Sequence, residues 1–221
     1  MDTPPVRRQD ITAALNLSGF DSWKSPLDSS QLKRPATRPS HLPGCGRQAA
    51  VMMVLVASQS RNSDASPDLL LIRRSEHLRY HAGQIALPGG RQEPNEPLLQ
   101  TAIRETEEEI GVSIQDQDIV GSLRSIYIPP SDFTLTPFVA WLDQEPNISI
   151  QIEEVESLIT LPLASLTDPG AQTTARVVRD NGETIEAPCY RCQDTRENHV
   201  VWGATALVIS ELIARLNALA L

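Results

Sequence analysis

Apolar residues in this chain fall mainly into short runs of the length of a β-strand. Residues 49–57 (AAVMMVLVA) are apolar throughout, which is typical of a buried central strand. Residues 69–73 form a second run, and the polar stretch 58–67 lets the two pair as a hairpin with a long loop. Residues 133–142 (FTLTPFVAWL) are a further strand pattern. Pro137 within it predicts an edge strand or a bulge, because proline has no N–H to donate to a ladder.

Weaker strand patterns occupy much of the remaining chain. They are separated by turn residues such as Asp180-Asn181-Gly182. A short helical turn is predicted at 163–166, directly after Pro162. The weaker strands are predicted at 119–127, 148–152, 175–178, 185–190 and 200–202.

Two stretches have the spacing of three and four residues that marks an amphipathic helix. Residues 204–219 (ATALVISELIARLNAL) are expected to pack on a sheet. The other helix is expected to start at an N-cap, Asn95, and to stop at Gly111. A third, short helix is predicted at 10–17 with Asp10 as its cap. The apolar stripe of the second helix consists of Leu98, Leu99, Ala102, Ile103, Thr106 and Ile110.

Strands interrupted by two substantial helices predict an α/β (α+β) fold, a sandwich in which a mixed β-sheet lies between helices. A chain of 221 residues is long enough for one domain with a sizeable core. We assign that domain to residues 46–221. Residues 1–45 are expected to be an N-terminal arm, which holds the short helix and an irregular part rich in Ser, Pro and basic residues.

The chain is acidic, with a formal net charge of −9. This balance argues against non-specific binding to nucleic acid or to an anionic membrane. No apolar stretch is long enough for a transmembrane helix, and the N-terminus MDTPPVRRQD lacks the apolar core of a secretory signal. We therefore predict a cytoplasmic protein.

Cys189 and Cys192 form a C-x-x-C motif, and His199 follows on the C-terminal side. A zinc site would need further ligands that the sequence does not place. A redox pair is no better supported, because no thioredoxin-like helix follows. Reduced cysteines without a special function are the expectation.

Three glutamates, Glu105, Glu108 and Glu109, stand at i, i+3 and i+4 of the second helix, so they are neighbours on one face. Like charges this close repel one another, so a cation is expected among them. Oxygen ligands in this arrangement suit Mg2+ or Mn2+. The alternative is a solvated face, which is the commoner reading of a glutamate-rich helix.

The spacing around these glutamates favours metal binding. Residues 90–112 fit G-x5-E-x7-R-E-U-x-E-E-x-G-U, where U is a bulky apolar residue. The stretch resembles the Nudix box, the motif of hydrolases that cleave a nucleoside diphosphate linked to another group. Thr106 stands where an apolar residue is usual, and we expect it to affect packing more than chemistry. The matching residues are Gly90, Glu96, Arg104, Glu105, Glu108, Glu109, Gly111 and Val112.

The segment before the box carries a second resemblance. Residues 69–90 are similar to L-L-x-x-R-S-x-x-L-R-x-H-x-G-x-V-x-F-P-G-G, a pattern of the coenzyme A pyrophosphatase branch of the Nudix superfamily. Leu87 replaces the usual Phe. With further short matches, the likeness covers roughly residues 48–215. The matching residues are Leu70, Leu71, Arg74, Ser75, Leu78, Arg79, His81, Gly83, Ile85, Pro88, Gly89 and Gly90.

The same segment is rich in cations, although the chain is acidic. Arginine suits phosphate because its planar fork can bind two oxygens, and coenzyme A carries a 3′-phosphate in addition to its diphosphate. A solvated charge at a strand end explains any single arginine equally well, and a structural role explains His81 equally well. The cations are Arg73, Arg74, His77, Arg79, His81 and Arg91.

The resemblance implies roles for the acidic helix and its neighbours. Glu105, Glu108, Glu109 and the Gly90 carbonyl are expected to hold one or more Mg2+ or Mn2+ ions, which bridge the diphosphate and activate a water. Arg104 is expected to orient the carboxylates.

The remaining roles are less closely fixed. Glu109 is one expected proton acceptor, and Glu154 or its neighbour Glu153 is another. Glu96 is expected to assist the metal or the water. The expected substrate-binding residues are Arg74, Arg79 and His81.

The implied reaction is the hydrolysis of coenzyme A to 3′,5′-ADP and 4′-phosphopantetheine. ADP-ribose, a dinucleotide such as NADH, or a nucleoside triphosphate would leave the chemistry unchanged. A non-catalytic nucleotide-binding regulator on the same scaffold is the alternative from another class, but it would be expected to lose the carboxylates that this chain retains. The expected partner is a small nucleotide substrate, and analogy with the fold leaves a homodimer open.

Overall fold

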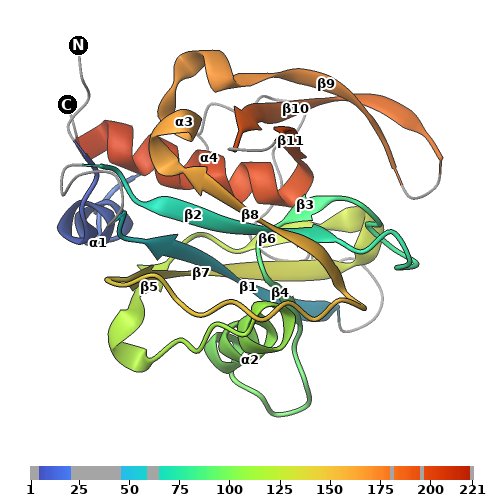
Figure 1. The fold of residues 1–221 in the computed structure, drawn as a ribbon, viewed down its shortest axis with the longest axis horizontal. Coiled ribbons are helices and arrows are strands. Elements are labelled where there is room, and N and C mark those ends of the chain that lie inside the picture. Colours follow the sequence, from blue (N-terminus) through green and yellow to red (C-terminus); the bar gives the residue numbers. More distant parts are fainter. Residues whose placement is uncertain (1–4, 21–45, 59–64, 180–181, 195–196, 220–221) are drawn as a thin grey trace.

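The computed structural model describes residues 5–20, 46–58, 65–179, 182–194 and 197–219. Within these residues, eight strands form one mixed sheet and three form a smaller antiparallel sheet (Figure 1). The main sheet contains β1 (Arg47–Val56), β2 (Asp68–Arg74), β3 (Ile85–Ala86), β4 (Gly89–Arg91), β5 (Ile119–Ser122), β6 (Ile126–Ile128), β7 (Phe133–Leu142) and β8 (Val155–Pro162). The smaller sheet contains β9 (Gln172–Val178), β10 (Thr184–Gln193) and β11 (Asn198–Trp202). The helices are α1 (Arg8–Leu15), α2 (Leu98–Ile110), α3 (Leu163–Thr167) and α4 (Gly203–Leu219), with short 3-10 helices at Asp116–Asp118, Pro129–Ser131 and Pro169–Ala171.

Strand β1 is the centre of the main sheet, as its apolar sequence predicted. It pairs antiparallel with β2 and β4 and parallel with β7. The predicted hairpin of β1 and β2 is confirmed, with Val54 opposite Leu70. Near the start of β1, Ala50 lies opposite Gly90. The pairing of β1 with β4 therefore fixes Gly89 and Gly90 against the centre of the sheet.

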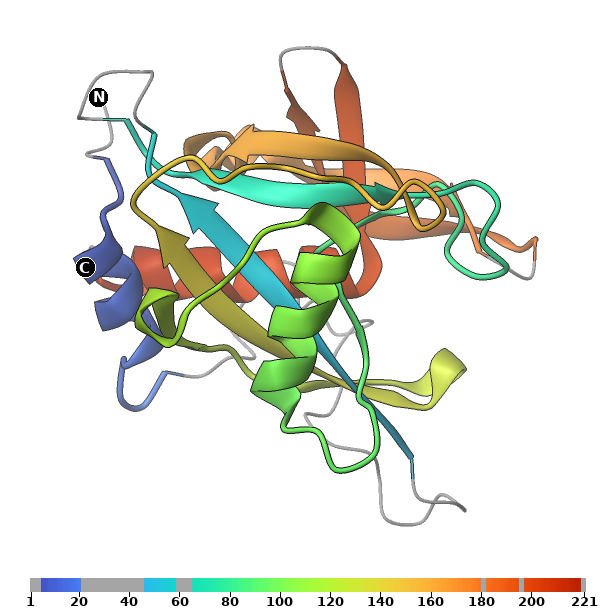
Figure 2. The ribbon, with the colours of Figure 1, turned by 60° about the horizontal axis from the view of Figure 1, so that its bottom comes forward.

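Successive side chains of β1 enter two different hydrophobic cores. Ala50, Met52 and Val54 pack with α2 on one face of the sheet. Met53 and Leu55 pack on the other face with residues of α4. Figures 1 and 2 show the two helices on opposite sides of the sheet. The predicted sandwich of a mixed sheet between helices is confirmed, and the alternation of a strand explains why β1 is apolar on both faces.

The smaller sheet lies on the α4 side of the molecule (Figure 1). Tyr190 of β10 and Val201 of β11 belong to the same core as α4. Cys189 and Cys192 are buried and not disulfide-bonded. They stand three residues apart on β10, so their side chains point to opposite faces. Cys189 packs within the smaller sheet, whereas Cys192 packs in the α4 core, so the C-x-x-C motif does not converge on one point.

Pro137 is not on an edge strand, contrary to one of the two predictions made for it. β7 lies between β1 and the pair β5 and β6. The proline is accommodated because the strand opposite it is interrupted: β6 pairs with β7 up to Leu135, and β5 begins its pairing at Phe138. Between them, the Pro137 carbonyl accepts a hydrogen bond from Leu123 N at 3.0 Å. The predicted strand at 119–127 is therefore divided into two.

The strand predicted at 148–152 is absent. This segment is irregular, and its Ile152 side chain is 76% exposed. Its backbone instead bonds the end of α2: Ser149 N donates to Ile110 O at 2.9 Å, and Gln151 N donates to Glu109 O at 3.0 Å. The segment thereby satisfies carbonyls that the last turn of a helix leaves without intrahelical partners.

Helix α1 is docked on the domain. Its N-cap is Arg7, not Asp10; Asp10 lies in the first turn and accepts from Arg7 N at 2.8 Å. Arg215 of α4 donates to the carbonyls of Ala14 and Leu15, each at 3.3 Å. Most of the predicted irregular part of the arm, residues 21–45, and part of the turn at 180–182 lie outside the described residues. None of the described helices is long and apolar enough to cross a membrane.

Candidate active site

Helix α2 carries the glutamates along its side nearest β4. The helix starts later than predicted, with Pro97 as its N-cap. Asn95 has φ +64° and belongs to the turn before it. The predicted stop is confirmed: Gly111 has φ +72° and its N–H donates to the Glu107 carbonyl. A Cβ at Gly111 would collide with Ser149, so glycine also permits the close approach of the segment after β7.

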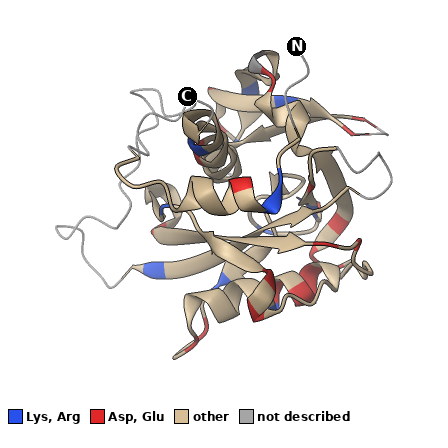
Figure 3. Ribbon diagram, turned by 90° about the vertical axis from the view of Figure 1, so that its left-hand side faces the viewer, with Lys and Arg blue, Asp and Glu red and all other residues tan. Residues whose placement is uncertain are grey.

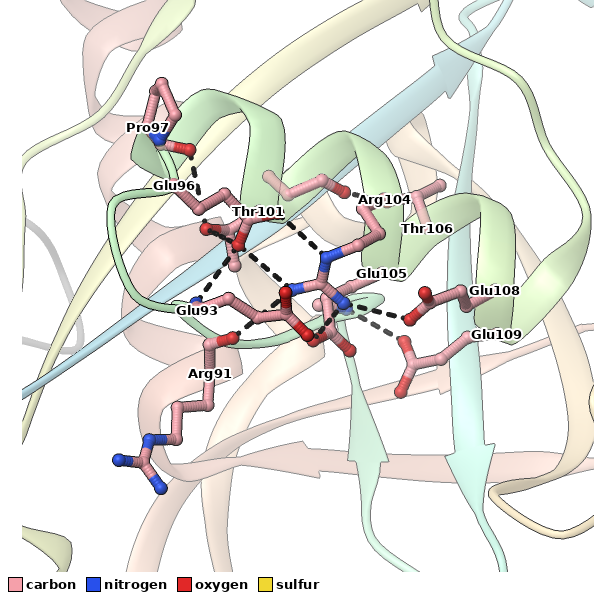
Figure 4. A network of polar contacts seen from close by, with 12 residues as sticks. Arg91, Glu93, Glu96, Pro97, Thr101, Arg104, Glu105, Thr106, Glu108 and Glu109 are labelled. Carbon is pink, nitrogen blue, oxygen red and sulfur yellow. Dashed lines mark hydrogen bonds and ion pairs between the residues drawn. The ribbon is translucent and has the colours of Figure 1, made fainter.

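Arg104 links the acidic residues of the site (Figure 4). Its Nη1 donates to Glu105 Oε1 and Glu108 Oε2, each at 2.9 Å. Its Nε and Nη2 donate to the two oxygens of Glu96 at 2.8 and 3.1 Å. The hydrogen bond to Glu96 is the main reason that the pKa of Arg104 is raised above its ordinary value. The cation expected among the glutamates is therefore supplied, in this structure, by the helix itself.

Glu96 fixes the turn that leads into α2. Besides its two bonds from Arg104, it accepts from Thr101 Oγ1 at 2.7 Å and from Glu93 N at 3.1 Å. The hydrogen bond from Arg104 is the main cause that lowers the pKa of Glu96 to about 2. Glu96 therefore holds both Arg104 and the turn before α2 in place. The fixed spacing of Glu96 and Arg104 in the motif is the sequence signal that could have suggested their contact.

The two glycines of β4 allow the backbone to approach its neighbours closely. Gly89 has φ +145°, a conformation that favours glycine. A Cβ there would collide with the Ala50 carbonyl and with Val51 of β1. At Gly90, a Cβ would collide with the carboxylate of Glu105. The absence of a side chain at Gly90 therefore brings the backbone of β4 against a carboxylate of α2.

Glu109 is the buried member of the cluster, with a side chain that is 2% exposed. Its Oε2 accepts from Gly89 N at 2.8 Å, and its Oε1 lies 3.5 Å from Arg74 Nη1. Burial raises the pKa of Glu109 to about 7, although the Gly89 hydrogen bond and the charge of Arg74 oppose the shift. The sequence indicated Arg74 as a substrate contact but not this ion pair.

Glu154, directly before β8, influences the carboxyl groups of Glu105 and Glu109 through its charge. Burial raises the pKa of Glu105, and the charge of Glu154 adds to the rise at both Glu105 and Glu109. Glu154 directly precedes β8, and its carbonyl accepts from Ser75 N at 2.8 Å. Its neighbour Glu153 is exposed, and the Glu153 N–H bonds Gln151 Oε1 at 3.0 Å. Of these two predicted proton acceptors, Glu154 is the one that influences the carboxyl groups of α2.

Thr106 stands where the motif usually has an apolar residue, and it is buried with its hydroxyl hydrogen-bonded. Its exposed fraction is 0%, and its Oγ1 donates to the Ala102 carbonyl at 2.6 Å. A hydroxyl that bonds back to its own helix costs little when buried, so the threonine fits a position where an apolar residue is usual.

The two arginines at the end of β2, Arg73 and Arg74, point to opposite faces of the strand. Arg74 points to Glu109 on the α2 side. Arg73 points to the other side, where its Nη2 lies 2.6 Å from Glu197 Oε1 and 3.4 Å from His199 Nδ1. Neighbouring residues of a strand face opposite ways, so only Arg74 of this pair is available to the glutamates.

The loop between β2 and β3, residues 75–84, has a defined conformation. Arg74 N donates to Gln84 O at 3.0 Å, and Gly83 N donates to Arg74 O at 3.1 Å. Arg79 and His81 are exposed on this loop. Arg79 lies over the Tyr80 ring, and His81 has φ +58° with its Nδ1 3.1 Å from Gln84 Oε1. Of the three predicted substrate-binding residues, Arg74 therefore lies at the end of β2, next to Glu109, and Arg79 and His81 lie on the loop that follows.

Negative charge is concentrated near the site. In Figure 3, Asp and Glu gather along α2, where Arg104 is the one basic residue. An anionic substrate would be repelled by such a surface unless cations were added close to the carboxylates.

The donor set fits a hard divalent cation. The carboxylates of Glu105, Glu108 and Glu109 and the carbonyl of Gly90 offer only oxygen, and the missing Cβ at Gly90 leaves room for the Glu105 carboxylate against the β4 backbone. Among the described residues, however, no three Asp, Glu, His or Cys side chains converge as a metal-binding group. Arg104 bridges Glu105 and Glu108, and Glu109 is turned to the backbone of β4. The chemistry fits a metal ion, while in this structure the Arg104 guanidinium bridges two of the carboxylates.

Comparison with known proteins agrees with this geometry. The NUDIX domain model matches residues 46–180. Nudix hydrolase 3 of Caenorhabditis elegans is 30% identical, with 76% of this chain and 72% of that protein covered. The uncharacterized Nudix hydrolase NudL of Yersinia enterocolitica is 31% identical, with 85% and 89% covered. A MutT/nudix family protein from Enterococcus faecalis has a similar fold, with a TM-score of 0.54 at 20% identity over 83% of this chain and 65% of that one. The chain therefore belongs to the Nudix family, and its reaction class is the hydrolysis of a nucleoside diphosphate derivative.

Proposed function

We propose that this Nudix hydrolase cleaves the diphosphate of coenzyme A, or of a coenzyme A derivative, to give 3′,5′-ADP and 4′-phosphopantetheine. The observation that carries the proposal is the path of the chain from β2 to α2. Arg74 ends β2 and pairs with Glu109, the following loop presents Arg79 and His81, and the chain then returns to the carboxylates at Gly90. The segment that resembles coenzyme A pyrophosphatases is therefore continuous with the acidic cluster.

In this proposal Glu105, Glu108, Glu109 and the Gly90 carbonyl hold one or more Mg2+ or Mn2+ ions. A bound divalent ion supplies positive charge to the diphosphate and lowers the pKa of a water. Arg104 keeps Glu105 and Glu108 within reach of each other through its two bonds to them.

The protein's own residues then bind the anion and accept a proton. The guanidinium groups of Arg74 and Arg79 are suited to phosphate oxygens. Water forms a new bond to one phosphorus while that phosphorus loses its bond to the bridging oxygen. Glu109 and Glu154 are the proposed proton acceptors; in the protein without metal, burial raises the pKa of Glu109 to about 7.

Product analysis tests the proposal directly. The full chain would be incubated with coenzyme A and Mg2+ or Mn2+, and the products separated and identified by mass. We expect 3′,5′-ADP and 4′-phosphopantetheine in equal amounts, and no products in the presence of a chelator. ADP-ribose, NADH and nucleoside triphosphates would be compared by kcat/KM.

Each contrary result has a distinct meaning. A higher kcat/KM for ADP-ribose or NADH than for coenzyme A would overturn the substrate but keep the chemistry. Binding of nucleotides without hydrolysis of any of them would instead identify a non-catalytic regulator.

A further inference from the structure

Tyr80 is an aromatic residue exposed to solvent on the loop that begins directly after Arg74, the arginine that pairs with Glu109. Its exposed fraction is 57%, whereas Tyr127 and Tyr190 are buried at 3% and 0%. A single exposed apolar side chain is ordinary on a protein surface. Tyr80 differs because of the segment that carries it, the loop between β2 and β3 whose first residues are tied to the acidic cluster.

The loop is held in place at both ends. The hydrogen bonds of Arg74 with Gln84 and Gly83 close its base, and Ser75 N bonds the carbonyl of Glu154. In Figures 1 and 2 this loop lies next to the segment that precedes β8. The loop that carries Tyr80 is therefore anchored at its base, beside the residue that precedes β8.

The ring has positive charge beside it. The guanidinium of Arg79 lies 5.2 Å from the centroid of the Tyr80 ring, and His81 follows directly in the sequence. Aromatic rings flanked by arginine stack with nucleobases, because every base has a flat π-face and its attached phosphates are anionic. The pantetheine arm of coenzyme A offers neither a flat ring nor a second phosphate, whereas the adenosine half has both an adenine and a 3′-phosphate.

We propose that Tyr80, with Arg79 beside it, is a stacking platform for the adenine base, so that the nucleotide half of the substrate lies along the β2–β3 loop. This assignment deepens the proposed function and rests on it for the identity of the substrate. It adds a specificity-determining residue that the motif leaves unspecified, since Tyr80 stands at an x position between Arg79 and His81.

Binding measurements separate this platform from the catalytic proposal. The dissociation constant of adenosine 3′,5′-diphosphate would be measured by calorimetry for the full chain and for Tyr80→Ala, Tyr80→Phe and Val178→Ala. Val178 is 62% exposed on β9 and serves as the surface control. We expect about tenfold weaker binding for Tyr80→Ala, as for loss of one base–aromatic stack, and unchanged binding for Tyr80→Phe and Val178→Ala.

A second ligand identifies the part of the substrate that is recognised. Tyr80→Ala should bind 4′-phosphopantetheine as the unmodified chain does, and with coenzyme A it should raise KM about tenfold with little change in kcat. The platform is overturned if Tyr80→Ala binds adenosine 3′,5′-diphosphate normally, if Tyr80→Phe loses as much affinity, or if affinity for 4′-phosphopantetheine falls equally. None of the binding results requires turnover, so failure of the coenzyme A reaction would be recognised separately.

Discussion

The chain contains two clusters that its sequence marks as metal-site candidates, and the fold treats them differently. Glu105, Glu108 and Glu109 lie on the same helix, α2, on one face of the main sheet, and Glu105 and Glu109 contact the backbone of β4. Cys189 and Cys192 are separated into two cores. The spacing of three residues is common to both, but a helix brings such residues to one face, whereas a strand sends them to opposite faces. The same spacing therefore indicates a shared site only when the residues lie on a helix, and not when they lie on a strand.

The largest effect is expected when a carboxylate of the helical cluster is neutralised. Glu109→Gln keeps the shape of a 2% exposed side chain but removes its ability to bind a cation or accept a proton. We expect turnover to fall by about a thousandfold or more, with the folded structure retained by circular dichroism. Glu107→Gln is the matched control, because Glu107 is exposed on the same helix. Equal activity in the two variants would remove the cluster from the mechanism.

A methyl group at Gly90 tests the close approach of β4 to the cluster. Gly90→Ala places a Cβ against the Glu105 carboxylate, and a displacement of about 1 Å at a catalytic group costs on the order of a hundredfold in rate. Gly170→Ala, in a 3-10 turn on the other side of the sheet, is the control. For both variants, kcat and KM would be measured. An unchanged kcat/KM for Gly90→Ala would show that catalysis does not depend on the present position of Glu105.

The Arg104–Glu96 pair is expected to matter for stability as well as activity. Arg104→Lys loses the planar fork that bonds both Glu96 oxygens, which we expect to cost about 1–3 kcal/mol in the free energy of unfolding. Urea denaturation of Arg104→Lys, Glu96→Gln and the double variant would measure this. Because the two residues form one unit, the single costs should not add. Additive costs would mean that each residue acts alone.

The pH dependence of stability should separate Glu109 from Glu96. The pKa of Glu109 is raised by burial to about 7, so the folded state holds a proton that the unfolded state releases near pH 4.5. In the metal-free protein, Glu109 therefore lowers the free energy of unfolding as pH rises from about 4.5 to 7, by on the order of 3 kcal/mol in total. Glu96, whose pKa is lowered to about 2, acts oppositely and loses its contribution as pH falls below about 4.5.

Thermal denaturation at a series of pH values, in chelator, would test this contrast. Glu109→Gln should remove most of the decline between pH 4.5 and 7, with a remainder from Glu105, whose pKa burial also raises, and Glu96→Gln should leave that decline in place. The same decline in Glu109→Gln as in the unmodified chain would assign it to another group.

The smallest effect is expected at the cysteines of the smaller sheet. Cys189→Ala and Cys192→Ala should each leave Mg2+-dependent activity unchanged and lower stability by about 1 kcal/mol through lost packing. Elemental analysis of the purified chain should find no stoichiometric zinc. Zinc bound at one ion per chain, and lost on either substitution, would contradict the divergence of the two side chains.

Much of the fold follows from local pattern. The apolar run at β1 predicted a central strand because a strand buried on both faces needs no alternation. The amphipathic spacing predicted α2 and α4, and Gly111 ends α2 as predicted. The start of α2 was predicted two residues early, because Asn95 is a good N-cap residue but here belongs to a turn that Glu96 and Arg104 hold. A cap depends on such contacts, which residue preference alone does not reveal.

The sequence by itself determined the acidic face of α2, the two glycines before it and the cations that precede it, because helix and strand periods are set by the backbone and act over a few residues. Only the tertiary structure decided which of these groups meet. The pairing of β1 with β4 brings Gly89 to Glu109, the register of β2 sends Arg74 rather than Arg73 to that carboxylate, and the segment before β8 adds Glu154 from another part of the chain. These encounters depend on contacts between segments far apart in sequence, and burial at their meeting point is what shifts the Glu109 pKa toward neutrality.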